Sequence, residues 1–221
     1  MIPIKAIIFD MDGVLVDSEP FHVENEKRMF KKMGLDISDE EHVGYMGTAT
    51  DVMWAKIIKD RNLPHDVVDL TILTIQEGLP FFRSLEKIEP MPGLTELLKK
   101  LQAKKIPLAV ASSSDVETIR IILDKSGLKK YFLYAVSSSE VGKSKPEPDI
   151  FLHTATLLSV KPEECLVIED STNGIRAAKS ANMVCVAYSG ASADNQDQSL
   201  ADEQIADYSD LESTIEKYMQ L

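Results

Sequence analysis

Basic residues are scarce in this sequence. Its 221 residues include 24 Lys and Arg against 36 Asp and Glu, which gives a formal net charge of −12. Nucleic acids and anionic membranes repel so acidic a chain, so we expect neither as a partner. For the same reason, an anionic substrate would need a local cation or metal ion in order to bind.

Cysteines and long apolar runs are also few. The two cysteines, Cys165 and Cys185, each lie in a short β-like run, which favours buried free thiols over a disulfide framework. Nowhere do 18 apolar residues occur together, and the apolar run 6–9 is cut by Asp10, so we expect no signal peptide and no membrane span. We therefore expect a cytoplasmic protein.

The remaining composition, 44% apolar and 27% charged, is typical of a globular protein with a sizeable core. Short, nearly continuous apolar runs are typical of parallel strands that are covered on both faces. The runs that predict strands are residues 4–9, 106–111, 134–136, 165–168 and 184–187. Helical patterns lie between them, so the sequence predicts an α/β fold with a doubly wound, Rossmann-like parallel sheet.

The starts of several helices are also predicted. Ser114 is followed by Glu117 three residues later, a capping-box pattern, so we expect Ser114 to cap a helix whose buried stripe includes Val116. Other helices are expected to follow Ser171 and to begin at Ser209.

Residues 18–88 interrupt the alternation of strands and helices. This segment contains three helical patterns and no convincing strand: residues 21–33, 50–61 and 66–78. Pro80 is expected to limit or kink the third helix. We therefore expect residues 1–17 and 89–221 to form an α/β core domain, and residues 18–88 to form a small all-α cap domain inserted into it.

Two acidic residues directly follow the first expected strand. Asp10 and Asp12 lie past its carboxyl end, which is where open α/β sheets bind ligands. In an extended backbone both side chains point the same way, and Gly13 then allows a sharp turn. An acidic β-turn is the alternative interpretation, but it does not explain why an apolar strand leads straight into two acids.

Polar residues follow other expected strands as well. Serines 112–114 end the second strand and are suited to hold an anion, although a plain helix cap would need only one of them. Lys145 is followed by the stiff Pro146, and by itself it reads as a solvated charge in a loop. Glu169 and Asp170 end the fourth strand and fit either a hard-cation site or a doubly capped helix.

Taken together and in this order, these residues resemble the signature of the haloacid dehalogenase-like hydrolase superfamily. The matching residues extend over almost the whole chain: Asp10-x-Asp12-Gly13-Val14-Leu15, Ser112, Lys145-Pro146 and Glu169-Asp170. Within the superfamily the chain is similar to the beta-phosphoglucomutase-like phosphatases. The segments that carry this closer resemblance are residues 17–20, 45–47, 144–149 and 169–174.

The resemblance implies a role for each residue in catalysis. Asp10 would be the nucleophile that forms an aspartyl-phosphate, and Asp12 would be the general acid and then the general base. Ser112, the backbone N–H of Ser113 and Lys145 would hold the transferring phosphate and neutralise its charge.

The resemblance also implies Mg²⁺ as the cofactor. Its protein ligands would be the carboxylates of Asp10 and Asp170 and the backbone carbonyl of Asp12. Glu169 would either bind the ion through water or hold Lys145 in place.

Three residues of the expected cap and hinge are candidates for contacting the rest of the substrate: His22, Gly47 and Thr50. His22 matches a hinge-helix histidine of the mutase, although a lone histidine on a helix is more often ordinary surface. Thr50 stands where the mutase has an arginine that clamps a second phosphate, and Asp115 stands where the mutase has a lysine.

We therefore predict a Mg²⁺-dependent phosphatase, a phosphoric monoester hydrolase, that acts as a monomer on a small phosphorylated metabolite such as a sugar or polyol phosphate. A beta-phosphoglucomutase-type mutase is the alternative. A haloacid dehalogenase would not need the metal ligands, and a phosphonatase would need a desolvated lysine in the cap. A non-catalytic binding protein would be expected to lack one of the core residues, and all of them are present.

Overall fold

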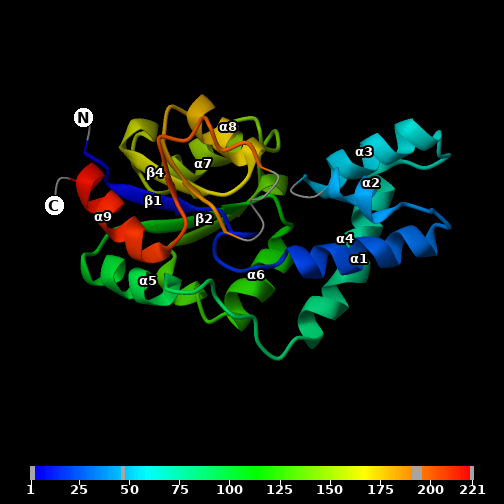
Figure 1. Cartoon of the computed structure of the whole chain (residues 1–221), viewed down its shortest axis with the longest axis horizontal. Helices are drawn as coiled ribbons and strands as arrows, with labels where there is room; N and C mark the ends of the chain where they lie inside the picture. The colour runs from blue at the N-terminus through cyan, green and yellow to red at the C-terminus, as the bar shows by residue number, and fades with distance from the viewer. Residues whose placement is uncertain (1–2, 46–47, 191–195, 220–221) are drawn as a thin grey trace. The chain divides into compact units, whose positions relative to one another are not determined.

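The computed structural model describes residues 3–45, 48–190 and 196–219. The chain divides into two compact units, Met1–Asp17 with Lys87–Leu221, and Ser18–Glu86. The first unit combines strands and helices, whereas the elements described in the second unit are helices joined by loops (Figure 1).

The α/β unit is built on a parallel sheet that has six strands within the described residues, in the order β3-β2-β1-β4-β5-β6. The strands are β1 (Ala6–Phe9), β2 (Leu108–Ser112), β3 (Tyr134–Ser137), β4 (Cys165–Glu169), β5 (Val184–Tyr188) and β6 (Glu203–Ile205). The strand order reverses at β1, as in other doubly wound sheets. The predicted fold class is therefore confirmed, and β6 adds a short edge strand that was not predicted.

Helices cover both faces of this sheet. They are α5 (Leu94–Ala103), α6 (Val116–Lys125), α7 (Asp149–Leu157), α8 (Thr172–Ser180) and α9 (Tyr208–Met219), with short 3₁₀ helices η1 (Lys129–Tyr131), η2 (Ser138–Glu140) and η3 (Pro162–Glu164). Figure 1 shows α7 and α8 on one face and α5, α6 and α9 on the other. Every residue of β1, β2 and β4 is buried, which is why these strands read as continuous apolar runs.

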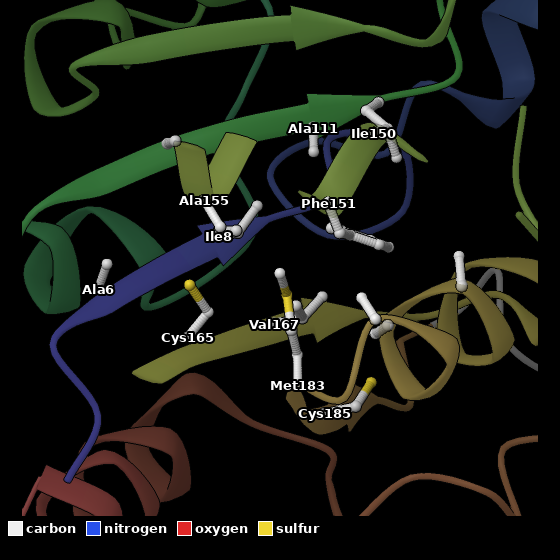
Figure 2. Close-up of a cluster of buried hydrophobic side chains, with 14 of the residues drawn as sticks. Ala6, Ile8, Ala111, Ile150, Phe151, Ala155, Cys165, Val167, Met183 and Cys185 are labelled. Carbon is white, nitrogen blue, oxygen red and sulfur yellow. The ribbon is translucent and has the colours of Figure 1, made fainter. Parts of the chain in front are cut away.

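Alternate residues of the central strands form a buried core beneath α7 and α8. Figure 2 shows Ala6, Ile8, Ala111, Cys165 and Val167 of the strands together with Ile150, Phe151 and Ala155 of α7. The two cysteines are free and buried, which confirms the interpretation made from their sequence context.

The start of α6 differs from the prediction. Asp115, not Ser114, is the N-cap, and its Oδ1 accepts hydrogen bonds from two backbone N–H groups of the first turn at 3.0 and 3.1 Å. Ser114 does not cap the helix because its hydroxyl donates to Asp12. Val116 is the first helical residue and is 50% exposed, so the buried stripe begins one turn later than predicted.

Two other helix starts were predicted within one residue. Ser171 caps α8, and its hydroxyl oxygen accepts the N–H of Gly174 at 3.1 Å. Helix α9 begins at Tyr208 rather than Ser209, because Asp207 acts as the acceptor for the N–H of Ser209 at 2.6 Å.

The helical unit contains α1 (Glu19–Lys32), α2 (Asp39–Val43), α3 (Thr50–Arg61) and α4 (Val67–Ser84). Its buried core consists of Met29, Phe30, Tyr45, Met53, Trp54, Ile57 and Leu70. Helix α2 was not predicted because five residues are too few to display a helical apolar period.

Helix α4 is longer than predicted. It continues through Pro80 to Ser84, although a proline nitrogen cannot donate the helical hydrogen bond. Aromatic packing accounts for the last turn, since the ring of Phe82 lies 6.3 Å from the ring of Phe21 and 5.4 Å from that of His22, measured between centroids. The predicted end at residue 78 is therefore wrong.

Candidate active site

Parallel pairing brings the acidic residues to one edge of the sheet. Phe9 of β1 is in register with Val110 of β2 and with Ile168 of β4. Asp10 continues the ladder, because its N–H donates to the carbonyl oxygen of Ile168 at 2.9 Å. Asp10 therefore lies beside Glu169 at the carboxyl ends of two neighbouring strands.

Lys145 lies buried between these carboxylates. Its Nζ donates to Oδ1 of Asp10 at 2.5 Å, to Oε1 of Glu169 at 2.7 Å and to the carbonyl oxygen of Ala111 at 3.1 Å. The ring of Phe151 covers the ammonium group, with its centroid 5.1 Å from Nζ. All three N–H groups are thus used, and Lys145 is not a solvated loop charge.

The electrostatics of this edge follow from burial and crowding. Burial, together with the carboxylates of Glu169 and Asp12, raises the pKa of Asp10 to about 8 against the opposing effect of Lys145. Burial, together with the carboxylates of Glu169, Asp10 and Asp12, raises the pKa of Asp170 well above its usual value. Burial alone would lower the pKa of Lys145, but the carboxylates of Asp10 and Glu169 raise it above its usual range.

These carboxylates fit a divalent cation. Asp10, Glu169 and Asp170 each place one oxygen within 4.8 Å of the other two, and carboxylate oxygens are the ligands that Mg²⁺ takes in proteins. A cation there would counter the burial and the mutual repulsion that raise the pKa values of Asp10 and Asp170. Glu169 is already engaged, because Oε1 accepts from Lys145 while Oε2 accepts from both the N–H and the hydroxyl of Ser171 at 2.9 Å. Both oxygens of Glu169 are thus taken by hydrogen bonds, which leaves Asp10 and Asp170 as the stronger candidate ligands, while Glu169 holds Lys145.

Two glycines allow the acidic side chains to lie this close to the backbone. A Cβ atom on Gly13 would lie 2.1 Å from Oδ2 of Asp170, and a Cβ atom on Gly174 would lie 1.6 Å from Oε1 of Glu169. Gly13 also has a φ of 83°, in the left-handed region. Any other residue at either position would displace a carboxylate of the site.

Asp12 faces the serines that end β2. Its Oδ2 accepts from the hydroxyl of Ser112 at 3.0 Å and from that of Ser114 at 2.9 Å. The N–H of Ser114 in turn donates to the hydroxyl oxygen of Ser112 at 3.0 Å. Ser113, between them, is exposed. The carboxylate of Asp12 is thus held by hydroxyl donors, and it is not among the three carboxylates that lie within 4.8 Å of one another.

A family model described as haloacid dehalogenase-like hydrolase matches residues 7–188. The chain belongs to this family. It is 32% identical over 189 residues to the phosphorylated carbohydrates phosphatase of Thermotoga maritima, covering 81% of this chain and 82% of that protein. It is 29% identical over 187 residues to the beta-phosphoglucomutase of Bacillus subtilis, covering 82% of each chain.

A solved structure extends the similarity to the whole fold. CbbY from Rhodobacter sphaeroides, in complex with xylulose-(1,5)bisphosphate, superposes with a TM-score of 0.84 at 25% identity, over 94% of this chain and 96% of that one. The resemblance inferred from sequence is therefore confirmed, and relatives named phosphatases support the expected class, phosphoric monoester hydrolase. In the described residues of this haloacid dehalogenase-like hydrolase, no helix has the length and apolar character needed to cross a membrane.

The remaining candidates belong to the helical unit of the hydrolase. His22 is half-buried in α1, where its ring packs on Phe82. Thr50 is the first residue of α3 and is half-buried. Gly47 lies outside the described residues.

Sequence reasoning missed two residues that are distant along the chain but hydrogen-bond directly to the backbone at this edge of the sheet. The hydroxyl of Tyr208 donates to the carbonyl oxygen of Val14 at 2.6 Å, in the loop that follows Asp12. The side chain of Gln198 donates to the carbonyl oxygen of Asp170 at 2.8 Å. Neither residue lies in a recognisable local motif, so no signal in the sequence marked them.

Proposed function

We propose that this hydrolase is a Mg²⁺-dependent phosphatase that cleaves a sugar or polyol monophosphate through an aspartyl-phosphate on Asp10. The observation that carries the proposal is the position of Asp10 at the end of β1, where Lys145 holds Oδ1. Among the described residues, none forms a hydrogen bond to Oδ2, which leaves that oxygen to act as the nucleophile. The substrate class is supported by a relative that is named for phosphorylated carbohydrates.

In the first step, Oδ2 of Asp10 attacks phosphorus and the ester P–O bond breaks. The leaving oxygen takes a proton from the carboxyl group of Asp12. In the second step, a water molecule attacks phosphorus and gives its proton to Asp12, while the bond from phosphorus to Asp10 breaks. Inorganic phosphate leaves, and both aspartates return to their starting states.

Attack of a carboxylate on a phosphate requires that negative charge be neutralised. Bound Mg²⁺ would supply positive charge beside Asp10 and the phosphate oxygens. Lys145 fixes Oδ1 of Asp10 and so aims Oδ2 toward the incoming phosphorus. Ser112 and the N–H of Ser113, at the end of β2, are the proposed phosphate donors. His22, Gly47 and Thr50 remain candidates for contacting the rest of the substrate.

Asp115, which follows the three serines, favours a substrate with one phosphate over a substrate with two. Asp115 is an acidic residue whose carboxylate is held in place here, because it caps α6 and also accepts from the hydroxyl of Thr118 at 2.5 Å. Thr50 lacks the positive charge that a phosphate clamp would supply. The alternative, a mutase, is favoured by the 29% identity to a beta-phosphoglucomutase.

The test is a panel of sugar and polyol phosphates, scored separately for released phosphate and for isomerised sugar phosphate. Phosphate release that needs Mg²⁺ and disappears in excess EDTA is expected. Asp10→Asn is expected to abolish turnover in a folded protein. Asp124→Asn, on the exposed end of α6, is the matched control and is expected to retain activity.

Beta-glucose 1-phosphate with a trace of glucose 1,6-bisphosphate separates the two functions. A phosphatase releases inorganic phosphate, whereas a mutase forms glucose 6-phosphate faster than it releases phosphate. The second result would refute the phosphatase proposal. Full activity of Asp10→Asn, or full activity in EDTA, would refute the mechanism.

A further inference from the structure

Gln198 is a buried polar residue that the proposed mechanism does not use. It lies between β5 and β6, and only 8% of it is exposed. Its Nε2 donates to the carbonyl oxygen of Asp170 at 2.8 Å and to that of Tyr188 at 3.1 Å. Its Oε1 accepts from the hydroxyl of Ser189 at 2.7 Å. Both N–H donors of the amide are used, so the side chain has one defined orientation.

These bonds join two strands at the point where their own pairing stops. Glu169 of β4 and Ala187 of β5 form the last pair of the ladder. The next carbonyl oxygens along the two strands, those of Asp170 and Tyr188, are bridged by the single amide of Gln198. The side chain thus adds one rung to the ladder and fixes the backbone of Asp170 against β5.

The two residues before Gln198 form hydrogen bonds with the segment that follows Asp170. Oε1 of Gln196 accepts from the N–H of Thr172 at 2.9 Å, and the hydroxyl oxygen of Thr172 accepts from the N–H of Asp197 at 2.7 Å. Residues 196–198 therefore hold the connection between β4 and α8, which carries Asp170, at two separate points.

The carboxylate of Asp170 needs such support. It lies within 4.8 Å of the carboxylate oxygens of Asp10 and Glu169 and is buried with them. Like charges this close repel one another, so when Asp170 ionises to bind a cation, any backbone shift that moves it away from the other two carboxylates is favoured. Gly13 contacts the carboxylate on one side, and Gln198 holds the backbone behind it.

We propose that Gln198 is a positioning residue: it fixes Asp170 in the orientation that binds the divalent cation. The proposal rests on the metal site of the proposed function. Residues that orient a metal ligand typically contribute about 10- to 100-fold to affinity. The expected effect of removing the amide is therefore a rise of about tenfold or more in the Kd for Mg²⁺.

The test is calorimetric titration of the full-length, metal-free protein with Mg²⁺ in the absence of substrate. Gln198→Met keeps the length of the side chain and removes its hydrogen bonds. Gln204→Met is the matched control, because the side chain of Gln204 donates to the backbone carbonyl of Gln198 rather than to that of Asp170. If Gln198→Met does not fold, Gln198→Asn takes its place, since it keeps the amide but is one methylene shorter.

The expected result is a Kd at least tenfold higher in the Gln198 variant and within twofold of wild type in Gln204→Met. The Mg²⁺ concentration at half-maximal activity should rise in parallel, with most of kcat retained at saturating Mg²⁺. A lower Tm with an unchanged Kd in the Gln198 variant would show that Gln198 is purely structural. This result would overturn the inference about Gln198 but not the metal site. Wild-type protein that binds no Mg²⁺ would overturn the metal site and the inference together.

Discussion

Gly174→Ala is the substitution for which the structure and helix propensity give opposite expectations. Gly174 lies in α8 with ordinary helical geometry, where replacing glycine by alanine normally stabilises a helix by about 1 kcal/mol. Here the added Cβ atom would lie 1.6 Å from Oε1 and 1.9 Å from Cδ of Glu169. Real Cβ contacts are essentially never below 3.0 Å, so the Glu169 side chain must move.

The cost of that movement follows from what Glu169 holds. The carboxylate is fully buried and accepts from Lys145 and from both donors of Ser171. Disrupting one partner of a buried ion pair costs about 3–5 kcal/mol. After the gain in helix propensity, we expect a net destabilisation of about 2–4 kcal/mol. With a urea m-value of about 2 kcal/mol/M, the midpoint should fall by about 1–2 M.

Urea unfolding followed by far-UV circular dichroism measures this change. The single tryptophan, Trp54, lies in the helical unit, so its fluorescence reports on that unit and not on the mutated one. Gly127→Ala is the matched control: its Cβ would meet nothing within 4 Å, but its φ of 69° is unfavourable for alanine. It should lose about 1–2 kcal/mol and keep its phosphatase activity.

Gly174→Ala should also lose most of its activity, because Lys145 is no longer held between two carboxylates. A Gly174→Ala protein as stable as wild type or more stable, with normal activity, would refute the assigned contact between Glu169 and α8. In that case Glu169 would have room to move without disturbing Lys145.

Three further expectations follow from buried groups. Lys145→Ala should lower kcat/KM by about 100-fold or more, because two buried carboxylates lose their cation; an unchanged kcat/KM in a phosphatase assay would contradict the role of Lys145. Tyr208→Phe should cost about 1–3 kcal/mol in urea unfolding, since the buried carbonyl of Val14 loses its donor; no change in stability would contradict that bond. Burial raises the pKa of the Cys165 thiol from 9.0 to about 12, so the unfolded thiol ionises first and stability should fall as pH rises above about 9. Rapid labelling of this thiol by a disulfide reagent in the native protein would show that it is not buried.

The ends of the central strands could be predicted because two local rules coincide there. A continuous apolar run predicts a strand buried on both faces, and the polar residue that ends the run must then lie at the edge of the sheet. This reasoning located Asp10, Ser112 and Glu169 without any knowledge of tertiary contacts. It could not decide whether Glu169 faces a cation or caps a helix, because the partner of Glu169 is Lys145, which reaches it from the loop between η2 and α7.

What the sequence could not predict depends on partners that are distant along the chain. Ser114 and Asp115 are both good N-caps, and the choice between them is made by Asp12, whose carboxylate takes the hydroxyl of Ser114. Gln198 and Tyr208 act from segments beyond β5, and neither is marked by spacing or periodicity. Helix α2 and strand β6 are too short to display a period at all.

An acidic chain can bind the proposed anionic substrate only if positive charge is available at this edge of the sheet. Lys145 is the basic residue held among the acids, and its three N–H groups are taken by Asp10, Glu169 and the backbone of Ala111. It can orient the nucleophile, but it has no donor left for phosphate unless one of these bonds breaks. The hydroxyl of Ser112 already donates to Asp12, so it too must exchange its bond when phosphate binds, and the N–H of Ser113 and a cation would meet the rest of the phosphate charge. In this arrangement a divalent ion would let the carboxylates lie close together and would also let the phosphate approach them, so we expect removal of the ion to weaken substrate binding as well as catalysis.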